Sequence, residues 1–247
     1  MFIEEHNTKY FLEFVECIKH LDNKIPIKFQ SGTDKLIFQT EQLTRRCFYN
    51  MILKLSFDSV LMDYSMYNIH LINLVNKQAK SILCPIFYTE EMRFDVDKKY
   101  DFVFIGHLSQ RRQQILNELL KYGFNMLIIQ NEFDFRKKYE LICSAKCLVN
   151  VHAYENYNVF EFARCSIPIY NNVKVVSEVC DGIELEKQNP VNKFVLERTV
   201  FAEFDKIVMS CLEVLKTEVE PINYEDLKRL SEEEINRINT ELKAYDC

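Results

Sequence analysis

A glycine and two arginines end an apolar run in the stretch YDFVFIGHLSQRR, residues 100–112. Gly106 is one of only four glycines in the chain, and it lies where a predicted strand turns into a predicted helix. Glycine lets a backbone approach a ligand closely, and the first turn of a helix offers free N–H groups to an anion. Arg111 and Arg112 fall in that turn, where a cation is unfavourable for the helix dipole. A bound phosphate would explain their position, and so would two solvated arginines beside a glycine that only makes the turn.

A second group of polar residues follows another apolar run, in the stretch VNVHAYENYNVFEFARCS, residues 149–166. Its polar members are Asn150, His152, Glu155, Glu161 and Arg164. Glu161 and Arg164 are three residues apart, so they would be neighbours on a helix and could simply form an ion pair. The same pair suits a nucleotide, because arginine binds phosphate and a carboxylate can accept hydrogen bonds from both ribose hydroxyls. A lone histidine such as His152 is more often structural than active, although its place at the end of a predicted strand favours an active role.

Predicted strands and helices alternate along the chain, which is typical of an α/β protein with a mostly parallel sheet. Strands are predicted at IPIKF, KLIFQT, SVLMDYS, SILCPIF, YDFVFIG, NMLIIQ, KCLVNVH, IPIYN and KVVSE. Helices are predicted over residues 8–22, from Glu41 after a Thr40 cap, and over residues 66–77, 109–122, 134–143, 157–166, 198–217 and 224–244. Ligands of such sheets bind outside the carboxyl ends of the strands. Gly106 and the second polar group are therefore expected to face one crevice.

A charged stretch without periodicity, TEEMRFDVDKK at residues 89–99, separates two apolar strands. Such a segment is typical of a linker between domains. We therefore predict a domain boundary near residue 97. Residues 1–97 would form an N-terminal α/β lobe, and residues 98–247 would form a Rossmann-like lobe that binds the ligand.

Composition restricts the class of protein. The net charge of −6 argues against general binding to nucleic-acid backbones, which usually requires a basic surplus. The nine cysteines form no C-x-x-C pair, so we expect reduced, mostly buried thiols in a soluble, cytoplasmic protein without a metal site. The N-terminus does not resemble a signal peptide, and no apolar run approaches the roughly 20 residues that span a bilayer. No transmembrane segment is expected.

The order of these segments resembles the nucleotide-sugar-binding half of GT-B glycosyltransferases. The matching pattern is FIG-x-L-x-x-RR-x-x-IL-x-x-L, followed by LVN-x-H, E-x-x-R and VVSE. In the first half, FQTEQLT and MDYSMYNIHLI resemble the EQL and D-Y-S-x-x-N segments of the same proteins. The resemblance spans roughly residues 36–178 and is strongest to short members from bacteria and large DNA viruses. It implies an α/β fold with two Rossmann-like lobes, of which the N-terminal, acceptor-side lobe is shortened.

The chain departs from the family pattern in its glutamates. Retaining GT-B enzymes have two glutamates separated by seven residues in a glycine-rich setting. Here Glu155 and Glu161 have five residues between them, and no glycine is near. Members of the family also usually open on a strand and a glycine-rich acceptor loop, whereas this chain is predicted to open on a helix. The fold is therefore better supported by the resemblance than the transfer activity is.

The resemblance, together with position, implies a role for each candidate residue. The donor diphosphate would be held by Gly106, Arg111 and Arg112. The donor ribose would be bound by Glu161, with Arg164 orienting that carboxylate or touching phosphate. The sugar would lie near Glu155 and His152. Glu41 or Asp63, from the N-terminal lobe, would reach the cleft as a base or a sugar contact, although either could be a capping or solvated residue.

The implied activity is transfer of a sugar from a nucleotide-diphosphate sugar to a hydroxyl of a glycan, protein or small molecule. It needs no metal and no cofactor other than the donor substrate, and the absence of a D-x-D motif agrees with this. One alternative is a non-catalytic nucleotide- or sugar-binding protein, which the shortened first lobe would favour. A receiver-type domain would require an acidic cluster at strand ends. An oxidoreductase of the Rossmann type would require the glycine fingerprint, which is missing.

Overall fold

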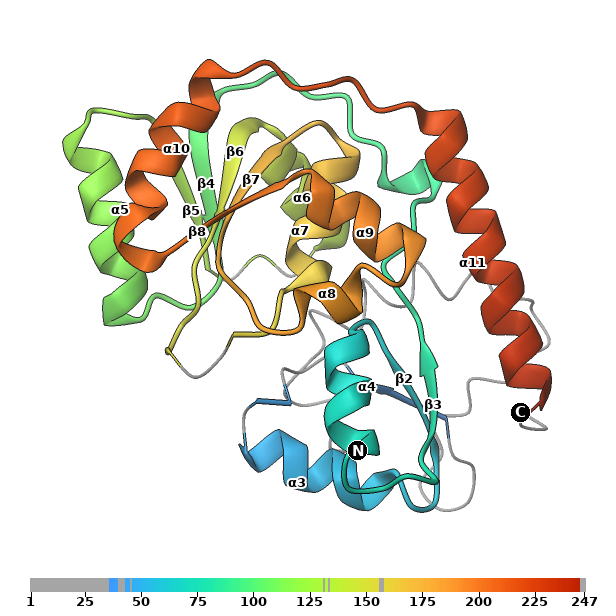
Figure 1. Ribbon diagram of the computed structural model, residues 1–247. Coiled ribbons are helices and arrows are strands. Elements are labelled where there is room, and N and C mark those ends of the chain that lie inside the picture. Colours follow the sequence, from blue (N-terminus) through green and yellow to red (C-terminus); the bar gives the residue numbers. More distant parts are fainter. Residues whose placement is uncertain are drawn as a thin grey trace.

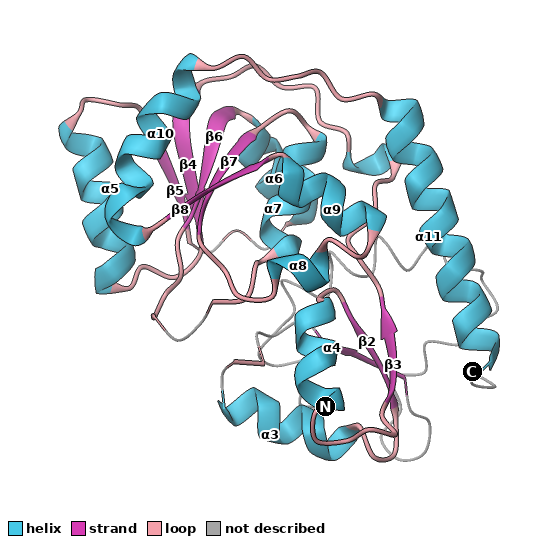
Figure 2. Cartoon of the chain, in the orientation of Figure 1, coloured by secondary structure: helices cyan, strands magenta, loops and turns pink. Residues whose placement is uncertain are grey.

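The computed structural model describes residues 36–39, 43–44, 46–130, 132, 134–155 and 158–244, and the statements below concern this part of the chain. The protein is an α/β protein with two parallel sheets, a small one near the start of the chain and a larger one in the second half (Figures 1 and 2). The predicted α/β class is thus confirmed. No helix within the described ranges is both long and apolar enough to cross a membrane.

The small sheet has the strand order β1-β2-β3, and all of its described pairs are parallel. Its elements are β1 (Leu36–Gln39), α3 (Arg46–Leu55), β2 (Val60–Asp63), α4 (Met66–Asn73) and β3 (Lys80–Leu83). Parallel neighbours require a crossover, and α3 and α4 supply the two crossovers. The strands predicted at KLIFQT, SVLMDYS and SILCPIF are confirmed. The predicted helix over 8–22, the strand IPIKF, the Thr40 cap and Glu41 lie outside the described residues.

The large sheet has the order β5-β4-β6-β7-β8, again with parallel pairs throughout. Its strands are β4 (Tyr100–Ile105), β5 (Met126–Ile129), β6 (Ala145–Asn150), β7 (Lys174–Glu178) and β8 (Thr199–Ala202). The strands that follow β4 in sequence lie on its two sides, because β5 is one neighbour and β6 is the other. The strand order therefore reverses between β4 and β6. In open α/β sheets this reversal opens a crevice at the carboxyl ends of the strands.

Helices cover both faces of the large sheet (Figure 1). One face packs against α5 (Gln110–Lys121) and α10 (Ile207–Lys216), with Phe102 and Val149 of the sheet meeting Leu119 and Cys211 of the helices. The other face packs against α6 (Phe135–Cys143), α7 (Phe162–Tyr170) and α9 (Pro190–Glu197). Short helices lie at Glu90–Met92 (η1), Ile183–Glu186 (α8) and Phe204–Lys206 (η2), and the long α11 (Tyr224–Ala244) ends the described chain.

Two predicted elements of the second half are corrected by the structure, and two of its helices were not predicted. The strand predicted at IPIYN is wrong, because these residues form the end of α7 despite Pro168. All nine residues of α7 are buried, so the helix has no polar face that could show a helical period in the sequence. The helix predicted over 198–217 is wrong in its first part, where β8 and η2 precede α10. Helices α8 and α9 were not predicted, whereas α11 is confirmed at its predicted bounds.

The segment predicted as a linker is packed onto the second half. Met92 and Phe94 are buried within it. The side chain of Asn171 accepts a hydrogen bond from Phe94 N (2.7 Å) and donates one to the Met92 carbonyl (2.8 Å). At the end of the chain, α11 runs back to the small sheet, and Arg237 Nη2 donates to the carbonyl of Leu83 (2.5 Å) (Figure 1). The boundary near residue 97 remains a prediction.

The buried carboxylate of Glu186 joins α8 to the start of α4. Glu186 accepts hydrogen bonds from Ser65 Oγ (2.5 Å), Met66 N (3.0 Å), Tyr67 N (3.0 Å) and Asn192 Nδ2 (2.9 Å). The carboxylate thus satisfies N–H groups that the first turn of α4 leaves free. Burial raises the pKa of Glu186, and these four donors oppose that shift.

Gly182, at the start of α8, packs against the same helix α4. Its φ of +72° lies in the left-handed region, and a Cβ added there would lie 2.5 Å from the ring of Tyr67 and 2.7 Å from its Cβ. Gly123 has a similar φ of +79°, but a Cβ there would meet nothing within 4 Å. The two glycines therefore differ in their surroundings and not in their backbone conformation.

We expect Gly182→Ala to destabilise the protein more than Gly123→Ala does. Both changes carry the left-handed penalty of about 1–2 kcal/mol. Only Gly182→Ala also forces Tyr67 and α4 away, which adds roughly 1–3 kcal/mol by overpacking. The measurement is the free energy of unfolding of each variant by chemical denaturation. Equal losses would contradict a tight contact between Gly182 and α4, and the double variant Gly182→Ala, Tyr67→Ala should recover part of the difference.

Candidate functional site

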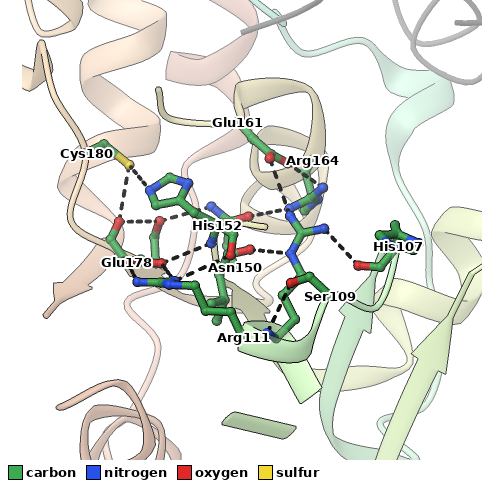
Figure 3. A network of polar contacts seen from close by, with 12 residues as sticks. His107, Ser109, Arg111, Asn150, His152, Glu161, Arg164, Glu178 and Cys180 are labelled. Atoms are coloured by element: carbon green, nitrogen blue, oxygen red, sulfur yellow. Dashed lines mark hydrogen bonds and ion pairs between the residues drawn. The ribbon is translucent and has the colours of Figure 1, made fainter. Parts of the chain in front are cut away.

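Polar side chains gather at the carboxyl ends of β4, β6 and β7, where the strand order reverses (Figure 3). We call the charged members of this group the arginine cluster: Arg111, Arg112, Arg164, Glu161 and Glu178. The structure thus brings together most of the residues that the sequence proposed for one crevice.

The first turn of α5 sets the direction of two of the arginines. Ser109 caps the helix, because its Oγ accepts a hydrogen bond from Arg112 N (3.3 Å). The side chain of Arg112 then turns inward, and the residue is only 4% exposed. Its Nε donates to the carbonyl of Val151 (2.7 Å), and its Nη1 donates to the carbonyl of His107 (2.9 Å). Arg112 is therefore a buried arginine that joins the end of β4 to the end of β6, and not a solvated one.

Gly106 provides the space for two guanidinium groups. Its φ is +128°, in the region that side chains rarely adopt. A Cβ at this position would lie 3.2 Å from Arg164 Nη2 and 3.5 Å from Arg112 Nη1. Any other residue would therefore press against Arg164 and strain the backbone, while it would touch Arg112 at an ordinary contact distance. The glycine of the opening motif is needed for this close packing, beyond its role in the turn.

Glu161 lies between the two buried arginines. Its Oε2 is 2.5 Å from Arg164 Nη2, and its Oε1 is 3.8 Å from Arg112 Nη2. Arg164, which is 7% exposed, also donates from Nη1 to Asn150 Oδ1 (2.8 Å). Asn150 in turn donates to Ser177 Oγ (3.0 Å). The ion pair weighed as an alternative for Glu161 is thus present, and a contact with ribose stays a prediction.

Arg111 pairs with a residue to which the sequence assigned no role. Its two terminal nitrogens bind both carboxylate oxygens of Glu178, one of them at 2.5 Å. The guanidinium also lies 3.8 Å over the ring of Phe204. Glu178 ends the strand KVVSE, so its place at a strand end was the signal that could have indicated it. The charge of Arg111 is therefore compensated by the carboxylate of Glu178, whereas Arg112 and Arg164 both contact the carboxylate of Glu161.

His152 is held by the same carboxylate. Its backbone N donates to Glu178 Oε2 (3.0 Å), and its ring Nε2 lies 3.2 Å from the carbonyl of Val179. A carbonyl can only accept, so Nε2 carries the proton and Nδ1 presents a lone pair. Nδ1 is buried, and no other described residue gives it a hydrogen bond. Burial lowers the pKa of His152, against the opposite influence of Glu178 and Glu161. The imidazole is thus a neutral acceptor that could receive the proton of a hydroxyl.

Cys180 lies beside this histidine, with its Sγ 3.5 Å from Nε2. Burial raises the pKa of the Cys180 thiol well above its usual value. The Nε2 proton is also directed toward the Val179 carbonyl, so His152 does not withdraw the thiol proton. Cys180 is therefore a protonated neighbour of the site and not an activated nucleophile.

Two sequence candidates lie elsewhere, and a third is not among the described residues. Glu155 is exposed on a turn after β6, away from the described contacts of the arginine cluster. Asp63 is buried at the end of β2, and its Oδ1 accepts from Ser65 N (2.9 Å) and Asn68 Nδ2 (3.2 Å) at the start of α4. Glu41 lies outside the described residues.

The arginine cluster has a positive balance of charge. Its described members carry three guanidinium groups and two carboxylates, and His152 beside them is held neutral. The start of α5 adds the positive end of a helix dipole. Within the described ranges, no three His, Cys, Asp or Glu side chains are grouped closely enough to hold a metal ion. The chemistry that the arrangement favours is binding of an anion by arginine and helix terminus.

We expect the stability of the protein to fall in mild acid through His152. Because the folded pKa is lowered, the unfolded chain binds this proton more readily. Stability is then lost as the pH falls below the unfolded value of about 6.5, with a slope of at most about 1.4 kcal/mol per pH unit. Free energies of unfolding across this range should show the slope in the wild type and a smaller one in His152→Gln. His70→Gln, at an exposed histidine of α4, should keep the wild-type slope. A His152→Gln variant with an unchanged slope would contradict this assignment.

No family model matches the chain. Its sequence is similar to proteins of Acanthamoeba polyphaga mimivirus. Uncharacterized protein L137 is 32% identical over 85% of this chain and 29% of the relative, and uncharacterized protein L140 is 30% identical over 77% of this chain and 61% of the relative. Uncharacterized protein R358 is 29% identical over 85% of this chain and 72% of its own length. The chain thus spans less than two thirds of L137 and L140. Over most of its length, this chain is therefore similar to proteins of a large DNA virus whose names state no activity.

Proposed function

We propose that the arginine cluster binds the diphosphate of a nucleotide-sugar, and that the protein is a GT-B-like glycosyltransferase. The observation that carries this proposal is the convergence of Arg112 and Arg164 on Gly106 at the reversal of strand order in a parallel sheet. This is the place where open α/β sheets bind their ligands. The two sheets would then correspond to two Rossmann-like lobes, with the acceptor entering from the side of the small sheet.

The charge of the site supports a diphosphate as the bound group. In the described ion pairs, Arg112 and Arg164 both contact the carboxylate of Glu161, whereas Arg111 pairs with Glu178. The planar guanidinium group matches the geometry of phosphate oxygens. The two arginines around Gly106 are therefore better candidates for the diphosphate than Arg111, whose part is to hold Glu178 and the backbone of His152.

Transfer would form a bond between the acceptor oxygen and the anomeric carbon of the sugar. The bond from that carbon to the diphosphate oxygen would break, and its electron pair would leave with the diphosphate. Arg112, Arg164 and the start of α5 would stabilise the leaving charge without a metal ion. The acceptor proton would pass to a base, for which His152 Nδ1 is the candidate with a lone pair inside the cluster. Glu41 and Asp63 remain proposals as contacts from the N-terminal lobe.

A non-catalytic binding protein is the alternative function. It is favoured by Asp63, whose carboxylate is used to hold the start of α4. Such a protein would bind the same nucleotide-sugars, but purified protein would neither hydrolyse nor transfer the sugar. Product analysis with a nucleotide-sugar and a mixture of acceptors separates the two functions.

Arg164→Gln should weaken nucleotide-diphosphate binding by roughly ten- to a hundredfold, since a hydrogen bond to a charged group contributes about 1.5–3 kcal/mol. The measurement is calorimetric titration with UDP-, GDP- and dTDP-sugars in the presence of EDTA, because the proposal requires no metal. Arg229→Gln is the matched control, since Arg229 lies on α11 with a 60% exposed side chain and pairs only along its helix in the described contacts. Equal affinity in the wild type and in folded Arg164→Gln would overturn the diphosphate assignment.

Glu161→Gln tests the ribose contact separately from the ion pair. The change should lower stability in any case, because Glu161 lies between Arg112 and Arg164. If Glu161 also binds ribose, wild type should prefer a nucleotide over its 2′,3′-dideoxy form, and the variant should lose that preference. A variant that still discriminates between the two ligands as wild type does would leave the carboxylate with only its role in the arginine cluster.

A further inference from the structure

A cavity lies at the amino ends of β7 and β8, at the end of the large sheet opposite the arginine cluster. It has a volume of about 220 Å³ and lies between the ends of α7 and α9 and the segment that leads from α10 to α11. Figure 1 shows this connecting segment crossing the end of the large sheet that faces away from the small sheet. Sites for drug-sized ligands have volumes of about 300–1,000 Å³, so this cavity suits a smaller molecule.

The floor of the cavity is apolar. Its aliphatic side chains include Ile169, Val173, Val175, Val200, Val214 and Ile222. Val200 of the edge strand β8 is 41% exposed, which is unusual for a valine of a parallel sheet covered on both faces. An apolar body in the cavity would remove this surface from water.

Arg198 lies in the wall with an unused guanidinium group. Its carbon Cζ stacks 3.9 Å over the ring of Phe194. The described residues provide it with no hydrogen bond and no ion pair, and its Nε is buried without a partner. Stacking fixes the plane of the group, so its edge can present two parallel N–H donors. Such an edge recognises a carboxylate.

Asn172 supplies an unused acceptor in the same wall. Its Nδ2 lies 3.4 Å from the hydroxyl oxygen of Tyr224, and that hydroxyl donates its own proton to the carbonyl of Tyr170 (3.0 Å). The Tyr224 oxygen can therefore only accept from Asn172, which fixes the orientation of the amide. Oδ1 is then buried without a partner among the described residues. A ligand with an N–H group would satisfy it.

The charges around the cavity exclude a nucleotide. Glu197, Glu218 and Glu220 line it and are exposed. Lys174 is directed away to main-chain carbonyls, of which Val214 O is 2.7 Å distant. A phosphate chain would meet three carboxylates, whereas a ligand with one carboxylate and one ammonium group would find a partner for each.

We propose that this cavity binds a small zwitterion with an apolar body, an aliphatic α-amino acid. Its carboxylate pairs with Arg198, its ammonium group donates to Asn172 Oδ1 beside the glutamates, and its side chain lies on the valine and isoleucine floor. The site is independent of the nucleotide site, since the two lie at opposite ends of the strands.

The experiment uses three probes that share one branched alkyl group: leucine, isocaproate without the ammonium group, and isoamylamine without the carboxylate. Each is titrated into the full chain by calorimetry and by the NMR shifts of labelled valine methyl groups. The variants are Arg198→Gln and Asn172→Gly, because glycine keeps the positive φ of +55° at this position. Arg229→Gln is the control arginine.

We expect leucine to bind more tightly than either truncated probe and to shift the methyl groups of Val175 and Val200. Arg198→Gln should weaken leucine and isocaproate at least about tenfold and leave isoamylamine unchanged. Asn172→Gly should weaken leucine and isoamylamine and leave isocaproate unchanged. The proposal is overturned if saturating leucine shifts neither valine, if Arg198→Gln binds leucine as wild type does, or if isocaproate equals leucine in affinity.

Discussion

The packing of two guanidinium groups against Gly106 is the constraint on which the centre of the large sheet depends. A side chain at this position would meet Arg164 and Arg112 at 3.2 and 3.5 Å. Arg112 ties the end of β4 to β6 through the carbonyls of His107 and Val151. Arg164 ties β6 to α7 through Asn150 and Glu161. The junctions of two strands and two helices therefore depend on the absence of one Cβ.

The burial of these charged groups costs free energy, so the arginine cluster is a poor source of stability if it has no other role. Burying charged groups removes them from water, and replacing buried ion pairs by well-packed apolar residues is often neutral or stabilising. The protein nonetheless places three arginines and two glutamates at one crevice, with a neutral His152 among them. Buried charged groups at the reversal of strand order in an open α/β sheet lie where such sheets bind their ligands. The physical cost of the cluster therefore supports the proposal that it binds a ligand.

Local pattern was sufficient to predict the alternation of strands and helices, the place of Gly106 and the polar strand ends. It predicted a helix over 157–166 but not the continuation of α7 to Tyr170, because a helix buried on all sides shows no period, and it did not predict the four-residue strand β8. Local pattern also did not predict which carboxylates the arginines bind. Arg111 binds Glu178, 67 residues away, only because the strand order places β6 next to β4 and β7 next to β6. Likewise Glu186 meets Ser65 across 121 residues, and nothing near either residue indicates the other.

The two ends of the large sheet differ in charge, and the same strand contributes to both. β7 begins at Lys174 beside the cavity rimmed by glutamates and ends at Glu178 within the arginine cluster. A polyanion is attracted to the carboxyl end, where guanidinium groups and a helix terminus outnumber carboxylates, and repelled from the amino end. A small zwitterion needs one partner of each sign, which the amino end offers in Arg198 and its neighbouring acids. Charge therefore supports the proposal of different ligand classes at the two ends, although an apolar core connects them.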